Sequence, residues 1–381
     1  EHNVLSDFGV SFLVVWLIGW MMLLFRSVVN EEDCDGDEIE MPVDVVFRSP
    51  GWTSLFCAVL GCGVHLLAVL ACAVTLAAAG VFQSHGQGTI YAAAIVIYSL
   101  TAVVAGYVGG SWYRKLGGTD WVHNALTTAT LFAGPVFFVW AFLNTVAIIY
   151  GSTATLPFGT ITALFALYLL VVLPLTLAGA IVGKNNSDDF DVPTPTTLLA
   201  SKSTQFPWWL LPTNFCGVAA QILVAGWFPF LSNYWFLQLE YTFSWLRGDL
   251  TFCIHYWSLV MNVIAFVLEI IFSVVIIAGA NLDARKHEWW WMSLICGGSP
   301  AFYMSVATFF SPGTGDFAMS GFLQLSFFYG YTGLYHYAVF LMLSAVGFFA
   351  TLIFLRLLAR YDENRKQRGI VKKSFSLWDI L

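Results

Sequence analysis

Long apolar stretches alternate with short polar segments along the whole chain. Each stretch reaches or exceeds the roughly 20 residues that a helix needs to cross about 30 Å of hydrocarbon. The apolar runs are continuous and do not alternate with period two, which favours helices over a β-barrel. The pattern predicts an all-α polytopic membrane protein, a bundle of nine transmembrane helices. The stretches are 8–29, 55–82, 89–113, 125–150, 156–183, 208–231, 250–280, 291–310 and 324–358.

The cationic side chains fall almost entirely on alternate loops between these stretches. Of the 16 Lys and Arg residues, only Arg247 lies on the opposite side. Cytoplasmic loops collect Lys and Arg during membrane insertion. With nine spans, the pattern therefore predicts a lumenal N-terminus and a cytosolic C-terminus. The sequon Asn185–Ser187 would then be cytosolic and carry no glycan.

The composition agrees with a lipid environment. The chain is 59% hydrophobic and 10% charged, against about 25% charged residues in ordinary soluble domains. The net charge of −7 comes largely from the acidic run Glu31–Glu40, so nucleic acid is not an expected partner. Within that run, Asp33, Asp35 and Asp37 resemble the start of a calcium loop, but the later positions lack the required Gly and Glu. A solvated acidic run is the better interpretation.

The loops divide the chain into four predicted parts. Residues 1–29 form the lumenal start and first helix, and residues 30–54 an acidic cytosolic loop. Residues 55–358 form an eight-helix membrane bundle, and residues 359–381 a basic cytosolic tail. The chain opens at Glu1, not Met, and we expect it to be part of something longer.

The seventh and ninth stretches are longer than the bilayer is thick, so each must tilt, protrude or break. Gly330 and Gly333 are the candidate break points in the ninth.

Five segments resemble the nonaspanins, the transmembrane nine superfamily, and occur in that family's order. The most extensive is Trp112–Trp121 followed by Asn124, and DVVFRSP at Asp44–Pro50 is similar to the family's approach to its second helix. Three further segments match the start of the family's fifth helix, the end of that helix and the start of its ninth. They are Leu156–Thr160, Leu173–Gly179 and Gly321–Thr332. The last five residues of the chain are Leu377–Leu381. They differ from the short Lys-x-Asp/Glu signal at the C-terminus of many family members, which retrograde coat proteins bind.

The resemblance implies a non-enzymatic Golgi or endosomal protein that sorts other membrane proteins. Clients with glycine-rich transmembrane helices are the expected partners, with cytosolic coat machinery as a further one. We expect no cofactor. No convergent nucleophile and base point to an enzyme, and no His pair or Cys-x-x-Cys motif points to a metal. The seven cysteines are interpreted as packing residues.

Glu269 is the clearest polar candidate within a span. A carboxylate there is unfavourable by about 2.5–3.5 kcal/mol on insertion scales, so it should face protein or water. Asn262, seven residues earlier, lies near the same helical face. The two residues could form part of a client groove, or line the midplane cavity of a secondary transporter or channel, which is the alternative function. A protonated or hydrogen-bonded structural Glu remains the competing interpretation.

Small residues form a row at Ala102, Gly106 and Gly110. Such rows let helix backbones approach closely. The row predicts either packing within the bundle or a groove for a client helix.

Two further sets of residues point to the membrane surface. Trp289, Trp290 and Trp291 lie at a predicted interface, where indoles anchor at headgroup level. The tail is expected to contact anionic lipid headgroups. Its candidates are Arg365, Lys366, Arg368, Lys372 and Lys373.

Overall fold

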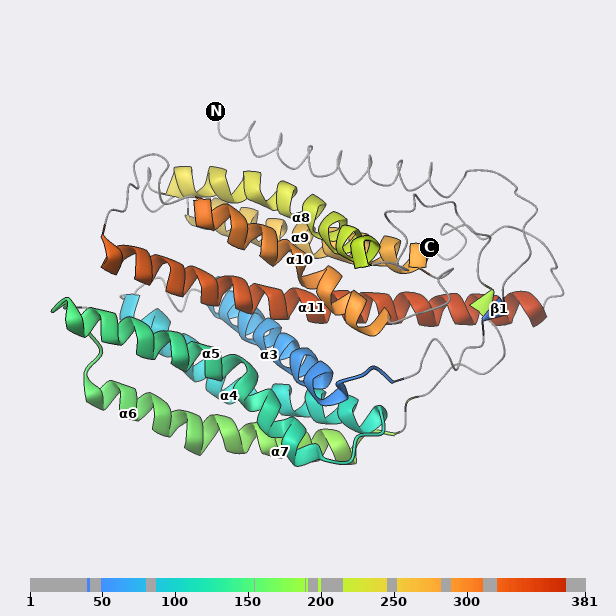
Figure 1. Cartoon of the computed structure of the whole chain (residues 1–381), viewed down its shortest axis with the longest axis horizontal. Coiled ribbons are helices and arrows are strands. Elements are labelled where there is room, and N and C mark those ends of the chain that lie inside the picture. The colour runs from blue at the N-terminus through green and yellow to red at the C-terminus, as the bar shows by residue number, and fades with distance from the viewer. Residues whose placement is uncertain are drawn as a thin grey trace. The chain divides into compact units, whose positions relative to one another are not determined.

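The computed structural model describes residues 40–41, 49–79, 87–153, 155–188, 190, 198–199, 215–244, 252–281, 289–310 and 321–367. The structure is almost entirely helical, as predicted (Figure 1). Its elements in chain order are β1 (Glu40–Met41), α3 (Thr53–Ala78), α4 (Gln87–Lys115), α5 (Trp121–Ile149), α6 (Phe158–Leu167), the π-helix η1 (Tyr168–Val172), α7 (Leu173–Asn185), β2 (Leu198–Leu199), α8 (Phe215–Ser244), α9 (Phe252–Asn281), α10 (Trp289–Phe310) and α11 (Phe322–Gln367).

Eight of the nine predicted apolar stretches coincide with this helical structure, and the first lies outside the described residues. Six helices in the described part are long and apolar enough to cross a membrane, with shorter apolar segments at Cys216–Leu231 and Val263–Ala278. Helices suit this setting because each backbone N–H and C=O finds a partner within its own segment. The short strands β1 and β2 pair antiparallel, with Glu40 opposite Leu199.

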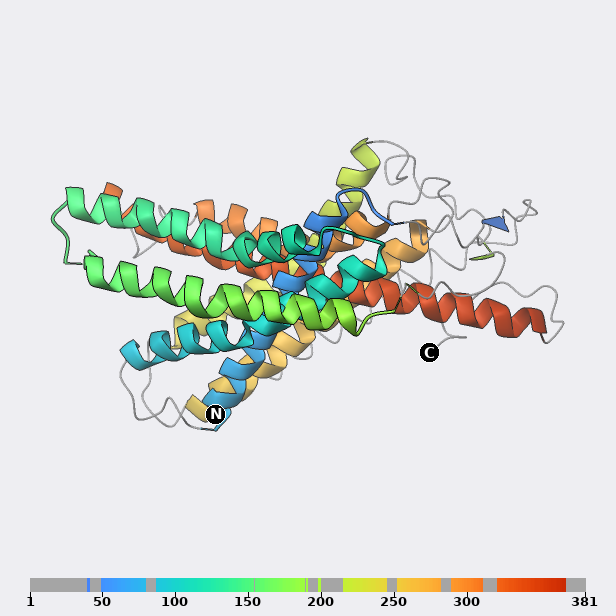
Figure 2. The same ribbon diagram turned by 90° about the horizontal axis from the view of Figure 1, so that it is seen from below.

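The fifth predicted stretch is not one uninterrupted α-helix. It comprises α6, η1 and α7, which Figure 2 shows as one continuous rod. At the end of η1 the N–H of Leu173 donates to the carbonyl of Tyr168, a bond one residue longer than in an α-helix. Pro174 follows directly and has no N–H to donate, which disturbs the ordinary hydrogen-bond ladder at this point.

Of the alternatives for the ninth stretch, a break at Gly330 or Gly333 does not occur, because α11 runs without interruption from Phe322 to Gln367. At 1.5 Å per residue this helix is about 69 Å long, so it protrudes beyond a 30 Å hydrocarbon layer. A Cβ atom at Gly330 would lie 2.9 Å from Leu143 Cδ1. The glycine therefore allows close contact with α5.

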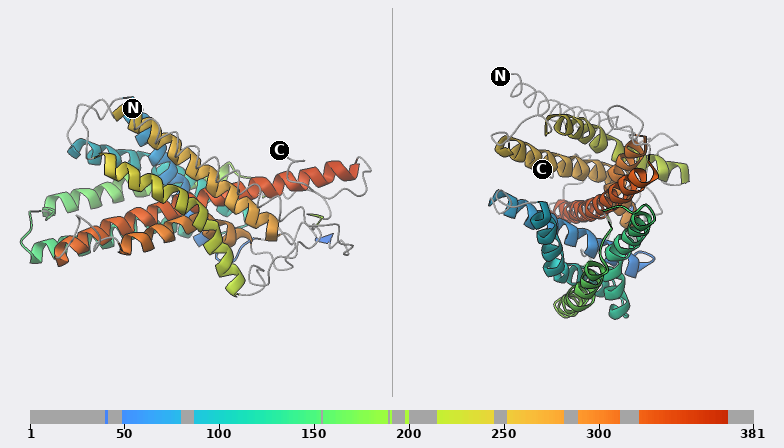
Figure 3. Two further views of the ribbon diagram at one scale, coloured as in Figure 1. Left: turned by 90° about the horizontal axis from the view of Figure 1, so that it is seen from above. Right: turned by 90° about the vertical axis from the view of Figure 1, so that its left-hand side faces the viewer.

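The chain forms two compact units. Unit 1 comprises Glu1–Arg48, Val192–Met304 and Val346–Leu381, and unit 2 comprises Ser49–Asp191 and Ser305–Ala345. In unit 1, α8 and α9 lie side by side (Figure 3), and the Ser273 hydroxyl of α9 donates to the Ala225 carbonyl of α8 at 2.7 Å. Unit 2 is built around α3, α4, α5 and α7.

Candidate functional site

The predicted small-residue row lies on one face of α4, and α7 packs directly against it. Ala102 is fully buried. A Cβ atom at Gly106 would overlap the carbonyl oxygen of Thr176, and one at Gly110 would lie 2.7 Å from the carbonyl oxygen of Ala180. The two helices touch backbone to backbone because glycine has no side chain here. A client helix would reach this row only if α7 moved away.

The contact is reciprocal. Gly179 and Gly183 of α7 face the backbone of α4 at Val103 and Tyr107, where added Cβ atoms would also overlap. Glycines from both helices therefore interlock along the seam between α4 and α7.

The helix α6 presents the opposite situation. It is strongly apolar, yet none of its side chains is buried in the described part of the chain. Phe158 is 82% exposed. Gly159 and Ala163, four residues apart, are both exposed, and an added Cβ at Gly159 would meet no described atom within 4 Å. An aromatic contact connects α6 to α5: Phe137 of α5 lies in edge contact with Phe165 at a centroid separation of 6.1 Å.

Glu269 lies on α9 within unit 1 and is only 5% exposed. It therefore faces protein, as an intramembrane carboxyl group should. The neighbouring residues Ile270 and Ser273 are buried as well. Asn262 belongs to the same helix, but its side chain lies outside the described residues.

The tryptophan triplet is mostly internal. Trp289 is 4% and Trp290 is 2% exposed, and both indoles stack on Phe348 of α11 with centroids 5.9 and 5.8 Å away. Trp291 is the one member of the triplet with a partly exposed side chain. Only this third indole is placed to act as the predicted surface anchor.

The predicted tail begins as helix, since α11 continues to Gln367. Arg365 and Lys366 belong to this helix, although their side chains are not described. Arg368, Lys372 and Lys373 lie outside the described residues. The headgroup contact of all five therefore stays a prediction.

Polar side chains connect neighbouring segments of unit 2. His65 of α3 lies 3.1 Å from both the Tyr98 carbonyl and the Thr101 hydroxyl of α4 through its Nε2 atom. The Asn144 side-chain oxygen accepts a hydrogen bond from the Leu156 N–H at 2.8 Å. In the described region, these polar residues within the predicted spans serve packing between segments.

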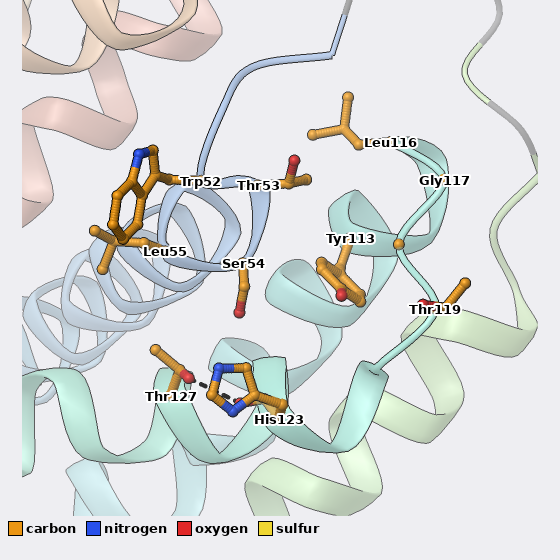
Figure 4. A pocket seen from close by; sticks show the side chains of 11 residues that line it. Trp52, Thr53, Ser54, Leu55, Tyr113, Leu116, Gly117, Thr119, His123 and Thr127 are labelled. Carbon is orange, nitrogen blue, oxygen red and sulfur yellow. Dashed lines mark hydrogen bonds between the residues drawn. The ribbon is translucent and has the colours of Figure 1, made fainter.

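A cavity of about 640 Å³ opens at one end of unit 2 (Figure 4). Three segments enclose it: the start of α3, the end of α4 with its following loop, and the start of α5. The lining residues are Trp52, Thr53, Ser54, Leu55, Tyr113, Leu116, Gly117, Gly118, Thr119, His123 and Thr127. The charge pattern predicts that this end faces the cytosol.

The loop on the cavity wall is shaped by a glycine turn. Gly117 has a φ of 78°, in the left-handed region that favours glycine. The N–H of Gly118 donates to the Tyr113 carbonyl at 2.9 Å and the N–H of Gly117 to the Arg114 carbonyl at 3.0 Å. This paired pattern ends α4 and turns the chain toward α5.

Sequence reasoning missed this cavity. The segment Trp112–Asn124 supported the family resemblance, but its sequence did not indicate that it lines a cavity. Trp52 and Ser54 were not among the candidate site residues. The available signal was the dense succession of Gly, Thr and aromatic residues at two helix starts. Only the fold shows that residues about 60 positions apart enclose one space.

Comparison with known proteins gives a consistent result. Residues 42–322 match the family described as Endomembrane protein 70. Transmembrane 9 superfamily member 4 of Arabidopsis thaliana is 38% identical over 355 residues, which cover 91% of this chain and 57% of that protein. Member 2 of the same plant is 39% identical over 351 residues, covering 91% of this chain and 57% of that protein.

Transmembrane 9 superfamily member 1 of Bos taurus is 34% identical over 380 residues, covering 93% of this chain and 60% of that protein. The chain thus spans somewhat more than half the length of these relatives. No solved structure matches it. The family match covers most of the chain and agrees with its apolar helices and its five resembling segments: the chain belongs to the Endomembrane protein 70 family, the transmembrane 9 superfamily of multi-pass membrane proteins.

Proposed function

We propose that this chain acts without catalysis in Golgi and endosomal membranes, where it sorts other transmembrane proteins. Its clients carry glycine-rich helices, and one client helix docks laterally against α6. The observation that supports this proposal is that no side chain of α6 is buried in the described part of the chain, while Phe158, Gly159 and Ala163 are exposed. Membership of a family described as endomembrane protein agrees with the location.

The docking chemistry follows from the absence of a hydrophobic driving force within lipid. Helices associate there largely through close packing, which small residues on both partners favour because they let the backbones approach. On α6, Gly159 and Ala163 lie one turn apart and are exposed, so a glycine-rich client could approach the backbone closely. The row on α4 has the same character, but α7 already occupies it.

The test uses a single-span reporter whose transmembrane helix carries glycines four residues apart. We expect this reporter to co-purify with the full chain and to follow it to Golgi membranes. Replacing Gly159 and Ala163 together by Leu should abolish co-purification, because the added side chains separate the two backbones. A reporter with Leu in place of its glycines should not bind.

Gly333→Leu provides the matched control. This glycine of α11 is also exposed, and an added Cβ would meet no described atom within 4 Å. The control variant should bind the reporter as the parent chain does. Unchanged binding by the Gly159→Leu, Ala163→Leu variant would refute docking on α6.

A further inference from the structure

We propose that α5 contains a hinge at Pro135 and that the Tyr337 hydroxyl of α11 holds this hinge in one position. The hinge in turn sets the position of α6 relative to α5. This inference rests on the proposed function, because α6 is the helix on which a client is proposed to dock. It adds a device that fixes the orientation of the docking surface.

Pro135 lies in the interior of α5. Proline has no N–H to donate, and its ring crowds the carbonyl four residues earlier, so helices bend at such positions. In α5 that carbonyl belongs to Leu131, which thereby lacks its helical donor. Within a membrane another protein group must satisfy such a carbonyl, because lipid offers no hydrogen-bond donor in its place. The proline therefore creates a weak point in α5 and an acceptor for a neighbouring helix.

A side chain of α11 supplies the missing donor. The Tyr337 hydroxyl donates to the Leu131 carbonyl at 2.9 Å, and both residues belong to unit 2. The Tyr337 ring stacks on Phe132 with a centroid separation of 6.1 Å and an interplanar angle of 13°. These three residues pack against a buried cluster that includes Cys62 of α3. The core therefore positions the hydroxyl at the carbonyl that Pro135 leaves without a donor.

The same arrangement recurs in unit 1. The carbonyl of Ala225, four residues before the proline of α8, accepts a hydrogen bond from the Ser273 hydroxyl of α9 at 2.7 Å. In α10 the Ser299 hydroxyl donates to the Cys296 carbonyl at 2.7 Å, four residues before Pro300. Three helices in the described ranges have a proline in their interior, and in each a hydroxyl donates to the carbonyl four residues earlier. The recurrence argues against a chance contact in α5.

The hinge lies next to the contact between α5 and α6. Phe137, two residues beyond Pro135, is in edge contact with Phe165 of α6, so a bend at the proline would displace the ring that contacts α6. With the hydroxyl bond in place, α5 keeps one bend angle and α6 one position. Without it, the two helices would populate several arrangements, and only some of these would present Gly159 and Ala163 to a client.

The test measures the bend of α5 by double electron–electron resonance on the full chain in nanodiscs. Nitroxide side chains are introduced at Leu126 and Ile148 as noncanonical amino acids, so the native cysteines stay in place. Both positions are exposed, and they lie 22 residues apart, about 33 Å along a straight helix. Tyr337→Phe keeps the ring and removes only the hydroxyl. It should broaden the distance distribution about twofold, because the carbonyl at the bend loses its donor. An unchanged width would overturn the proposal.

Pro135→Ala ties the effect of the hydroxyl to the proline. The restored N–H at this position donates to the Leu131 carbonyl, so the Tyr337 hydroxyl is no longer needed there. Adding Tyr337→Phe in this background should therefore leave the width unchanged, which makes the two substitutions strongly non-additive. Equal broadening by Tyr337→Phe in both backgrounds would show that the hydroxyl acts independently of the proline, and would overturn the proposal.

Tyr329→Phe is the matched control on the same helix. Its hydroxyl donates to the Phe309 carbonyl at 3.1 Å, in the last turn of α10 and not before a proline. The control variant should give the distance distribution of the parent chain. Broadening as large as that of Tyr337→Phe would contradict a specific role for Pro135.

Binding of a reporter helix with glycines four residues apart separates this inference from the proposed function. In the same nanodiscs, Tyr337→Phe should weaken reporter binding about threefold, because the apparent affinity falls with the fraction of chains that present the docking surface. Unchanged affinity together with a broadened distribution would overturn the link between the hinge and α6. Absence of binding by the parent chain would refute the proposed function, whereas the label distances would still decide whether Tyr337 holds the hinge.

Discussion

The seam between α4 and α7 and the helix α6 use the same residue types in opposite ways. In the seam, glycines of both helices bring backbones into direct contact. In α6, glycine and alanine are equally well spaced, but no described helix covers them. Small residues in a membrane helix therefore indicate where close approach is possible. They do not reveal whether the approaching helix belongs to the same chain.

The strongest test of this contrast is Gly106→Leu. The new side chain would overlap the backbone of Thr176, and backbone cannot move aside as a side-chain end can. We expect a loss of about 3 kcal/mol or more in the free energy of unfolding, at the upper end of overpacking effects. Thermal unfolding in detergent, followed by tryptophan fluorescence, measures it. Parent-like stability would show that α7 does not pack here.

An intermediate effect is expected from Phe137→Ala. This partly buried ring contacts Phe165 of α6 and also Tyr168 of η1, at a centroid separation of 5.6 Å. Its removal should lower the free energy of unfolding by about 1–2 kcal/mol, less than for a fully buried ring. Limited proteolysis of the loop between α5 and α6 should become faster. A cost as large as that of Gly106→Leu would mean that α6 is held more firmly than its exposure indicates.

The smallest effect is expected from Gly134→Leu on α5. This glycine is exposed, and an added Cβ would meet no described atom within 4 Å. The free energy of unfolding should change by no more than about 0.5 kcal/mol. The same unfolding assay as for Gly106→Leu makes the two glycines directly comparable. Destabilisation of similar size in both would remove the contrast between covered and open small residues.

Much of the fold was predictable because a bilayer imposes length and apolarity on every span. Those two constraints sufficed to locate α3 to α5 and α8 to α11 along the chain. They could not reveal η1, because a change of hydrogen-bond register depends on local competition around Pro174. They also could not show that Gly330, a candidate break point, instead makes room for Leu143.

The candidate sites were less predictable, because each depends on which helices become neighbours. The cost of a carboxyl group in lipid predicted that Glu269 faces protein or water, and the structure places it against protein. The packing of α7 onto Gly106 did not follow from the row of small residues itself. A client helix with small residues could pack against the same row. The cavity beside Ser54 forms because the starts of α3 and α5 lie close together. No periodicity in the sequence predicts that these two helix starts are neighbours.

The register change at η1 also has a mechanical consequence. Pro174 leaves one fewer amide to hold successive turns together, so bending the rod there disrupts fewer bonds than bending it elsewhere. The C-terminal half is clamped by interlocked glycines, whereas the N-terminal half is not. Thermal bending of this rod should therefore concentrate at η1. We expect α6 to move relative to α7, while α7 stays packed against α4.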